Sequence, residues 1–134
     1  PLPEAVLDRV GETYRSPGGQ WVATSGRARV LAYSPQRVEA DALPTTIAGL
    51  TDPAWRGRVG WAPTNASFQA FVTAMRKTQG DDATRAWLRA MKENDTKSYP
   101  KNTAIIEAIA AGEIDLGLPN HYYLLSFKAG DPDY

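Results

Sequence analysis

The sequence contains no cysteine and only one histidine among its 134 residues. Disulfides, zinc–thiolate sites and thiol nucleophiles are therefore excluded, while the redox compartment stays open because cysteine-free chains occur on both sides of membranes. The single histidine, His121, has no evident nucleophile partner beside it in the sequence. Gly18-Gly19 lacks both the lysine of a phosphate-binding loop and the dinucleotide-binding fingerprint. These absences predict that the chain is not an enzyme.

Net charge and long apolar runs are also lacking. The 15 basic and 15 acidic residues cancel, so the chain has no overall positive field of the kind that favours nucleic acid, and we expect no nucleic-acid partner. No apolar run approaches the roughly 20 residues of a membrane-spanning helix. The chain opens with Pro1-Leu2-Pro3, without an initiator methionine or a signal-peptide pattern. We interpret it as one domain or lobe of a longer protein.

The N-terminal part combines turn residues with β-forming residues. Residues 1–19 predict a loop-rich segment with at most a short helix over residues 4–10. Residues 20–33 are rich in β-formers and predict one long bent strand or two short ones. A short helix begun by Pro44, with Ile47 and Leu50 on its buried face, and a second capped turn are expected to follow.

The remainder alternates strand and helix signals. A helix with Phe68, Phe71, Val72 and Met75 at helical spacing is expected to end at Gly80. The full predicted order is a strand over residues 58–63, that helix, a helix from Asp81-Asp82, a short strand, a helix from Asn102 or Thr103 to Gly112, and a strand over residues 115–118. This order predicts an α/β fold.

The adjacent tyrosines Tyr122 and Tyr123 are the strongest clue to function. They lie in Asn120-His121-Tyr122-Tyr123, directly after the apolar run of residues 114–118. Open α/β proteins bind ligands just beyond the carboxyl ends of their strands, where helix N-termini also gather. Two phenols at such a junction could ligate a hard metal ion, although packing is the commoner use of a tyrosine pair.

Three turns are expected to converge on one crevice: residues 64–68, 101–103 and 120–123. At the first turn, backbone N–H groups together with Asn65 and Ser67 could cradle a small oxyanion. Structural alternatives stay open for all three. Asn and Ser cap helices routinely, Asn102 is most simply an N-cap, and Asn120 could satisfy neighbouring backbone groups.

Several segments, spread over nearly the whole chain, resemble the ferric-ion-binding proteins, which are the substrate-binding components of iron(III) ABC transporters. The Thr-Asp-Pro-x-Trp-x-Gly-x-Val pattern at residues 51–59 indicates the fold, whereas the Asn-x-Tyr-Tyr pattern at residues 120–123 points to iron. The other similar segments are Trp21-Val22-Ala23-Thr24-Ser25-Gly26-Arg27-Ala28-Arg29-Val30, Pro63-Thr64-Asn65-Ala66-Ser67-Phe68 and Lys101-Asn102.

The resemblance implies one lobe of a two-lobed, type II periplasmic-binding-protein-like fold, with a mixed sheet flanked by helices and the other lobe absent. It implies an extracytoplasmic location, periplasmic or anchored at the cell surface, and delivery of iron to an ABC permease. Tyr122 and Tyr123 would bind Fe(III) through their phenolates, together with a synergistic anion, phosphate or carbonate. The residues implied to hold that anion are Asn65, Ala66, Ser67, Asn102, Asn120 and Arg27. For Arg27 an exposed salt bridge is the alternative.

Hard Fe(III) favours anionic oxygen donors, and binding must displace the phenolic protons, so affinity should fall in acid. Some relatives have a third tyrosine where this chain has Phe68, which favours a two-tyrosine site with further ligands from the other lobe. We expect His121 to lie behind the ligands or on the surface. The alternatives are a lobe that binds an organic anion or polyamine and an isolated interaction module. A truncated lobe could also self-associate through exposed strand edges.

Overall fold

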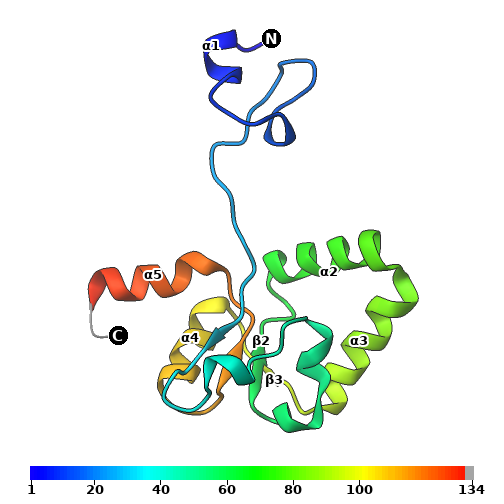
Figure 1. The fold of residues 1–134 in the computed structure, drawn as a ribbon, viewed down its shortest axis with the longest axis vertical. Helices are drawn as coiled ribbons and strands as arrows, with labels where there is room; N and C mark the ends of the chain where they lie inside the picture. The colour runs from blue at the N-terminus through cyan, green and yellow to red at the C-terminus, as the bar shows by residue number, and fades with distance from the viewer. Residues whose placement is uncertain (132–134) are drawn as a thin grey trace.

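The computed structural model describes residues 1–131, and its elements follow the predicted α/β order (Figure 1). The helices are α1 (Glu4–Leu7), α2 (Ala66–Gln79), α3 (Asp81–Glu93), α4 (Asn102–Ala110) and α5 (His121–Gly130). The 3₁₀ turns are η1 (Glu12–Tyr14), η2 (Ala40–Ala42), η3 (Ala48–Thr51) and η4 (Pro53–Trp55). The strands are β1 (Ala32–Tyr33), β2 (Val59–Trp61), β3 (Lys97–Ser98) and β4 (Leu116–Gly117). Within residues 1–131, no helix has the length and apolar character needed to cross a membrane.

The four short strands form one mixed sheet in the order β1-β4-β2-β3. Strand β2 pairs in parallel with β4 and β3, whereas β1 pairs antiparallel with β4. All three residues of β2 are buried, as expected for a strand covered on both faces. The predicted α/β class with a mixed sheet flanked by helices is confirmed.

The hydrophobic core lies on both faces of this sheet. Because neighbouring residues of a strand point to opposite faces, Val59 and Trp61 join the cluster that includes Phe68 of α2 and Trp87 of α3. The second cluster includes Ile105, Ala108 and Ile109 of α4 with Ile114. In Figure 1, α4 lies on one side of β2 and the α2–α3 pair on the other.

Helix α4 packs closely on the sheet because Gly117 of β4 has no side chain. A Cβ atom built at Gly117 would collide with Cγ2 of Ile105 and would lie 3.3 Å from Cδ1 of Ile109. Ile105 is fully buried and Ile109 nearly so. The glycine is thus a packing requirement of the β4–α4 contact.

Local signals placed α2 and α3 correctly. The Asn65 side chain accepts the Ser67 N–H over 2.9 Å and caps α2. The helix ends at Gly80, whose φ of 90° suits glycine. Helix α3 begins immediately afterwards with Asp81 and Asp82 in its first turn, as the helix dipole favours.

The short helix predicted to begin at Pro44 is the 3₁₀ turn η3, which begins only at Ala48, and the predicted second capped turn is η4. Thr46 Oγ1 accepts the Gly49 N–H over 3.2 Å ahead of η3, and Leu50 in that turn is buried. Asp52 Oδ1 accepts the Ala54 N–H over 2.8 Å and caps η4. A short polar side chain therefore accepts a backbone N–H near the start of each turn, and in η4 it comes from the N-cap residue itself.

The prediction of one long bent strand over residues 20–33 is wrong, and of the alternative, two short strands, only the second forms. Only Ala32 and Tyr33 form a strand, while Val22 and Arg29 make isolated bridges. Residues 24–27 make no backbone hydrogen bond within residues 1–131. They run as an extended connection from the N-terminal segment, which contains the expected short helix α1, to the α/β body (Figure 1). β-forming residues without a partner strand stay extended but unpaired.

Candidate anion and metal site

The backbone pairing of β1 with β4 continues beyond both strands and aligns the parts of the site. An isolated antiparallel bridge joins Arg29 to Asn120. His121 extends this pairing, because its N–H donates to the Ala28 carbonyl over 3.0 Å and its Nδ1 accepts the Ala28 N–H over 3.1 Å. The residues around Ala28 therefore lie beside the first turn of α5, which carries the tyrosines.

Tyr122 and Tyr123 are half-buried neighbours in this first turn. Their ring centroids lie 4.4 Å apart with 31° between the planes. The Arg27 guanidinium carbon lies 5.9 Å from the Tyr122 ring centroid, and Arg27 forms no ion pair within residues 1–131. A cation thus faces the phenol pair, whereas the alternative of a surface salt bridge for Arg27 finds no support in the described residues.

The two phenols have different acidities. A hydrogen bond with the Tyr123 hydroxyl is the largest influence on Tyr122 and lowers its pKa, with Asn120 and Arg27 acting in the same direction against the effect of burial. The same hydrogen bond, followed by desolvation, raises the pKa of Tyr123, against a lowering contribution from Asn102. The interaction between the two phenols therefore moves their pKa values apart.

Ser67 lies at the centre of a polar network at the start of α2. Its Oγ donates to Asn65 Oδ1 over 2.7 Å and accepts from Arg29 Nη2 over 2.7 Å. It also accepts from Asn102 Nδ2 over 3.3 Å. This one hydroxyl therefore joins the turn before α2, the start of α4 and the extended segment that pairs with Asn120. The three turns that we expected to converge do lie together.

Of the two interpretations of Asn102, the N-cap is wrong. Lys101 occupies the N-cap position, and Asn102 is the first residue of α4. The Asn102 side chain is fully buried and reaches Ser67, 35 positions away in the chain. Asn102 Oδ1 has no hydrogen-bond partner within the described residues. A partner on another helix thus replaced the local capping bond that the sequence pattern predicted.

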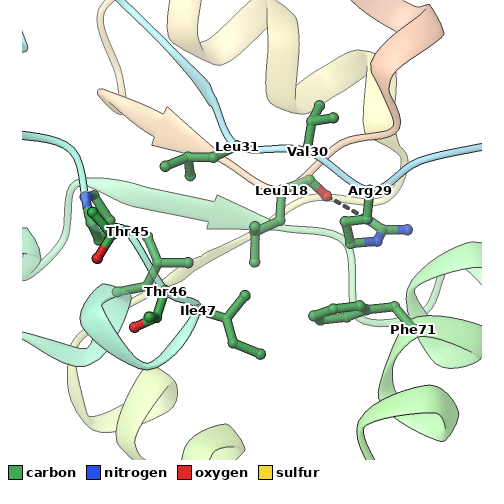
Figure 2. A pocket seen from close by; sticks show the side chains of 10 residues that line it. Arg29, Val30, Leu31, Thr45, Thr46, Ile47, Phe71 and Leu118 are labelled. Carbon is green, nitrogen blue, oxygen red and sulfur yellow. Dashed lines mark hydrogen bonds between the residues drawn. The ribbon is translucent and has the colours of Figure 1, made fainter. Parts of the chain in front are cut away.

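Arg29 is the principal site residue that the sequence analysis did not single out. Its guanidinium donates to the Leu118 carbonyl through Nη1 and to Ser67 through Nη2. The guanidinium carbon lies 5.4 Å from the Phe68 ring centroid and 5.6 Å from that of Phe71. Figure 2 shows Arg29 reaching back to the Leu118 carbonyl near the Phe71 ring. Two hydrogen bonds and two aromatic rings hold this side chain in place.

The alternation of Arg27 and Arg29 could have revealed Arg29. In an extended segment residues i and i+2 point to the same face, so the interpretation of Arg27 as an anion neighbour applies equally to Arg29. Burial lowers the pKa of Arg29, and the nearby Tyr123 and Tyr122 oppose that effect. The two arginines give this face of the segment a concentrated positive charge.

Two cavities adjoin Arg29. The larger, of 510 Å³, is lined by Arg27, Arg29, Ala66, Ser67, Ala70, Phe71 and Asn120. The smaller, of 190 Å³ and shown in Figure 2, is lined mainly by apolar side chains between Val30 and Leu118. Of the six predicted anion residues, Arg27, Ala66, Ser67 and Asn120 line the larger cavity, while Asn65 and Asn102 hydrogen-bond to Ser67.

Carboxylates and histidines supply no separate metal site in the described part of the chain. Residues 1–131 contain no group of three or more His, Cys, Asp or Glu residues that could hold a metal ion. Phe68, at the position of the third tyrosine in some relatives, is 2% exposed and packs edge-on against Trp61 at 5.6 Å. The tyrosine pair is therefore the set of donors in this region best suited to a hard metal ion.

Comparison with known proteins gives consistent matches. Residues 1–127 match a family described as bacterial extracellular solute-binding protein. The chain is 39% identical over 123 residues to the Fe(3+)-binding periplasmic protein of Serratia marcescens. The aligned region covers 92% of this chain and 36% of that protein. The chain therefore spans about a third of the length of this curated relative.

Two solved structures have the same fold as the chain. Iron-bound HitA from Pseudomonas aeruginosa superposes with a TM-score of 0.85 at 32% identity, over 98% of this chain and 42% of HitA. The Trichodesmium protein IdiA (FutA), in complex with iron and citrate, superposes with a TM-score of 0.84 at 28% identity, over 99% of this chain and 43% of that protein.

Proposed function

The chain belongs to the family of bacterial extracellular solute-binding proteins, and we propose that it binds ferric iron together with a small oxyanion. Its type II periplasmic-binding fold, predicted from the sequence, is confirmed by the superposed structures. The observation that carries the proposal is the tyrosine pair, whose rings lie 4.4 Å apart beside Arg27. The relatives named above, which are ferric-iron-binding or iron-bound proteins, support the same cargo.

The chemistry of the pair suits Fe(III). Phenolate is a hard, anionic oxygen donor, which matches a small and highly charged cation. The interaction between the two phenols lowers the pKa of Tyr122 and raises that of Tyr123, which favours loss of one proton from the pair when iron arrives. The metal then displaces the second proton. Two phenolates leave the coordination incomplete, and the anion and ligands outside residues 1–131 would fill the remaining positions.

The anion site is proposed at the larger cavity. Arg27 supplies a guanidinium there, and Ala66 lies at the first residue of α2, where unpaired N–H groups and the helix dipole favour negative charge. Phosphate or carbonate is the anion that we propose. The 510 Å³ volume also has room for a larger carboxylate, and citrate accompanies iron in the Trichodesmium protein.

The wider setting is likewise proposed. The chain would form one lobe of a two-lobed protein, with residues 1–19 as its loop-rich N-terminal segment. That protein would lie outside the cytoplasm and deliver iron to an ABC permease without catalysing a reaction. The name of the Serratia relative supports the location, and the family description supports the binding role.

A visible absorbance titration tests the iron proposal. Purified protein is titrated with chelated Fe(III) in the presence of phosphate or carbonate, beside the double variant Tyr122→Phe/Tyr123→Phe. The parent should develop a phenolate-to-iron charge-transfer band that the double variant lacks. Tyr14→Phe is the matched control, because Tyr14 is 63% exposed in the N-terminal segment, and it should keep the band. A parent without a band, both as this chain and within a two-lobed protein that contains it, would reject iron as the cargo.

An iron-free organic anion is the second candidate ligand. The two guanidinium groups of Arg27 and Arg29 at one cavity favour an anionic solute, and the same positive charge argues against a polyamine. Calorimetric binding of a carboxylate without iron, unchanged in the double tyrosine variant, would favour this candidate over ferric iron.

A further inference from the structure

We propose that Arg29 is a positioning residue for the anion site, acting through the Ser67 hydroxyl rather than by contact with the anion. The inference rests on the proposed anion site and adds a residue and a mechanism to it. It starts from the hydrogen-bond capacity of Ser67. A serine hydroxyl has one proton to donate and two lone pairs that accept.

All three positions of the Ser67 hydroxyl are occupied. Arg29 Nη2 at 2.7 Å and Asn102 Nδ2 at 3.3 Å donate to its lone pairs. The proton is therefore directed to Asn65 Oδ1, at 2.7 Å. If the Arg29 hydrogen bond were removed, a lone pair would be free and the hydroxyl could rotate away from Asn65. Arg29 thus fixes the direction in which Ser67 donates.

The fixed direction of the Ser67 hydroxyl determines how the Asn65 side chain is oriented. Its Oδ1 accepts both the hydroxyl and the N–H of Ser67, the latter over 2.9 Å. This double contact settles the orientation of the Asn65 amide, so its Nδ2 group points away from Ser67. Within residues 1–131 neither Asn65 Nδ2 nor the Ala66 N–H has an acceptor. These two donors at the N-terminus of α2 remain available to an anion, while the Ser67 hydroxyl does not.

The surroundings of Arg29 suit a fixed role. The guanidinium donates to the buried Leu118 carbonyl and lies over two aromatic rings, those of Phe68 and Phe71. Its Nε is buried without a hydrogen-bond partner among residues 1–131. A planar guanidinium can bond Leu118 and Ser67 at the same time, whereas a lysine ammonium on a flexible stem is a single point charge. Arg29→Lys therefore keeps the positive charge but removes the simultaneous hydrogen bonds to Leu118 and Ser67.

A double-mutant cycle on phosphate binding tests the proposal. The phosphate dependence of the iron charge-transfer band is measured for the parent, Arg29→Lys, Ser67→Ala and the double variant. Each single change should weaken phosphate by about tenfold, the size expected for loss of a charged hydrogen bond, and the double variant should be no weaker than either. Additive losses would mean that Arg29 contacts the anion itself and would overturn the proposal, as would unchanged phosphate affinity in Arg29→Lys.

Arg27→Lys is the matched control, because Arg27 lines the same cavity but makes no hydrogen bond to Ser67. Combined with Ser67→Ala, it should give additive losses of phosphate affinity. If Arg27→Lys and Ser67→Ala were coupled in phosphate affinity as strongly as Arg29→Lys and Ser67→Ala, the coupling would be a general effect of charge. That result would overturn the specific role of Arg29.

A second readout needs no iron. In nuclear magnetic resonance spectra of the metal-free protein, Arg29→Lys should shift the Ser67 amide and the Asn102 side-chain amide, and Arg27→Lys should leave both in place. If Arg29→Lys does not fold, Ser67→Ala should instead shift the Arg29 guanidinium signals. If the Ser67 and Asn102 signals do not shift in Arg29→Lys, or the Arg29 signals do not shift in Ser67→Ala where that variant is used instead, the proposal is overturned. A parent without an iron band but with these shifts would reject the proposed function and leave the Arg29–Ser67 relationship standing.

Discussion

The rings of Tyr122 and Tyr123 lie 4.4 Å apart, and the hydrogen bond between their hydroxyls moves the two pKa values in opposite directions. Ionisation of the first phenol therefore opposes ionisation of the second, since two adjacent phenolates repel each other. A highly charged cation removes that repulsion by neutralising both. Without a metal, few molecules carry both tyrosines as phenolates. A bound metal ion makes the doubly ionised pair favourable.

Iron affinity should fall as the pH falls. A free phenol has a pKa of about 10, and each phenol that is still protonated before binding must release one proton to the metal. Each such proton weakens binding about tenfold per pH unit of acidification. Competition against a chelator over a pH series measures the slope, and Tyr122→Phe should make it shallower by one proton. Affinity that is constant between mildly acidic and neutral pH would contradict a phenolate site.

Gly117→Ala should destabilise the fold. The added methyl group collides with Ile105 at the contact between β4 and α4, and overpacking of this kind costs about 1–3 kcal/mol in the free energy of unfolding. Chemical denaturation measures the change. Gly130→Ala is the control, since a Cβ at Gly130 meets no atom within 4 Å and alanine favours the helix. Equal effects of the two substitutions would contradict the packing argument.

Asp115 should make stability depend on acid. Its carboxylate accepts from Arg37 Nε at 2.7 Å and from Arg58 Nε at 2.6 Å. Burial alone raises the pKa of Asp115, but the hydrogen bonds from Arg58 and Arg37 outweigh it and lower the pKa. A lowered pKa means stability that is present above the unfolded value, about 3.9, and lost as the pH falls through the folded value.

Asp115→Asn should therefore lower the free energy of unfolding by about 1–2 kcal/mol at neutral pH, and the difference from the parent should vanish in acid. Denaturation at a series of pH values measures both. Asp95→Asn is the control, because Asp95 pairs with Arg56 and both side chains are more than half exposed, at 65% and 60%. A loss of equal size there would show that the partly buried position of Asp115 is not the cause.

The isolated chain should self-associate. Two large apolar side chains in different parts of the chain are exposed. Trp21, which lies between the N-terminal segment and the connection of residues 24–27, is 52% exposed, and Leu125 on α5 is 61% exposed. Sedimentation should show a mass that rises with concentration. Leu125→Gln should reduce the association, and Lys128→Gln on the same helix should not. A monomer across a wide concentration range would contradict this prediction.

Short-range signals accounted for most of the fold that could be predicted. The cap at Asn65, the stop at Gly80 and the acidic start at Asp81 act within a few residues of themselves, so they are visible in the sequence. The pairing of the tyrosines is visible for the same reason, because the two residues are adjacent.

What the sequence analysis missed depends on distant partners. Arg29 meets Ser67 across 38 positions and Asn102 meets Ser67 across 35, so neither contact with Ser67 can be read from neighbouring residues. The strand prediction for residues 20–33 failed for the opposite reason, because a local signal was present but a distant partner was lacking. Their composition favours strand, but only the part beside β4 found a ladder partner. Pairing, rather than propensity, decided the outcome.

The unpaired connection of residues 24–27 ends where the site begins. Backbone hydrogen bonding to the α/β body starts at Ala28, through His121, and the residue immediately before it is Arg27. Within residues 1–131, no backbone hydrogen bond holds residues 24–27, so Arg27 is tied to the α/β body from one side only, whereas Arg29 is held by its bridge to Asn120 and by its bonds to Leu118 and Ser67. The cation that faces Tyr122 is thus joined to the body only through the residue that follows it.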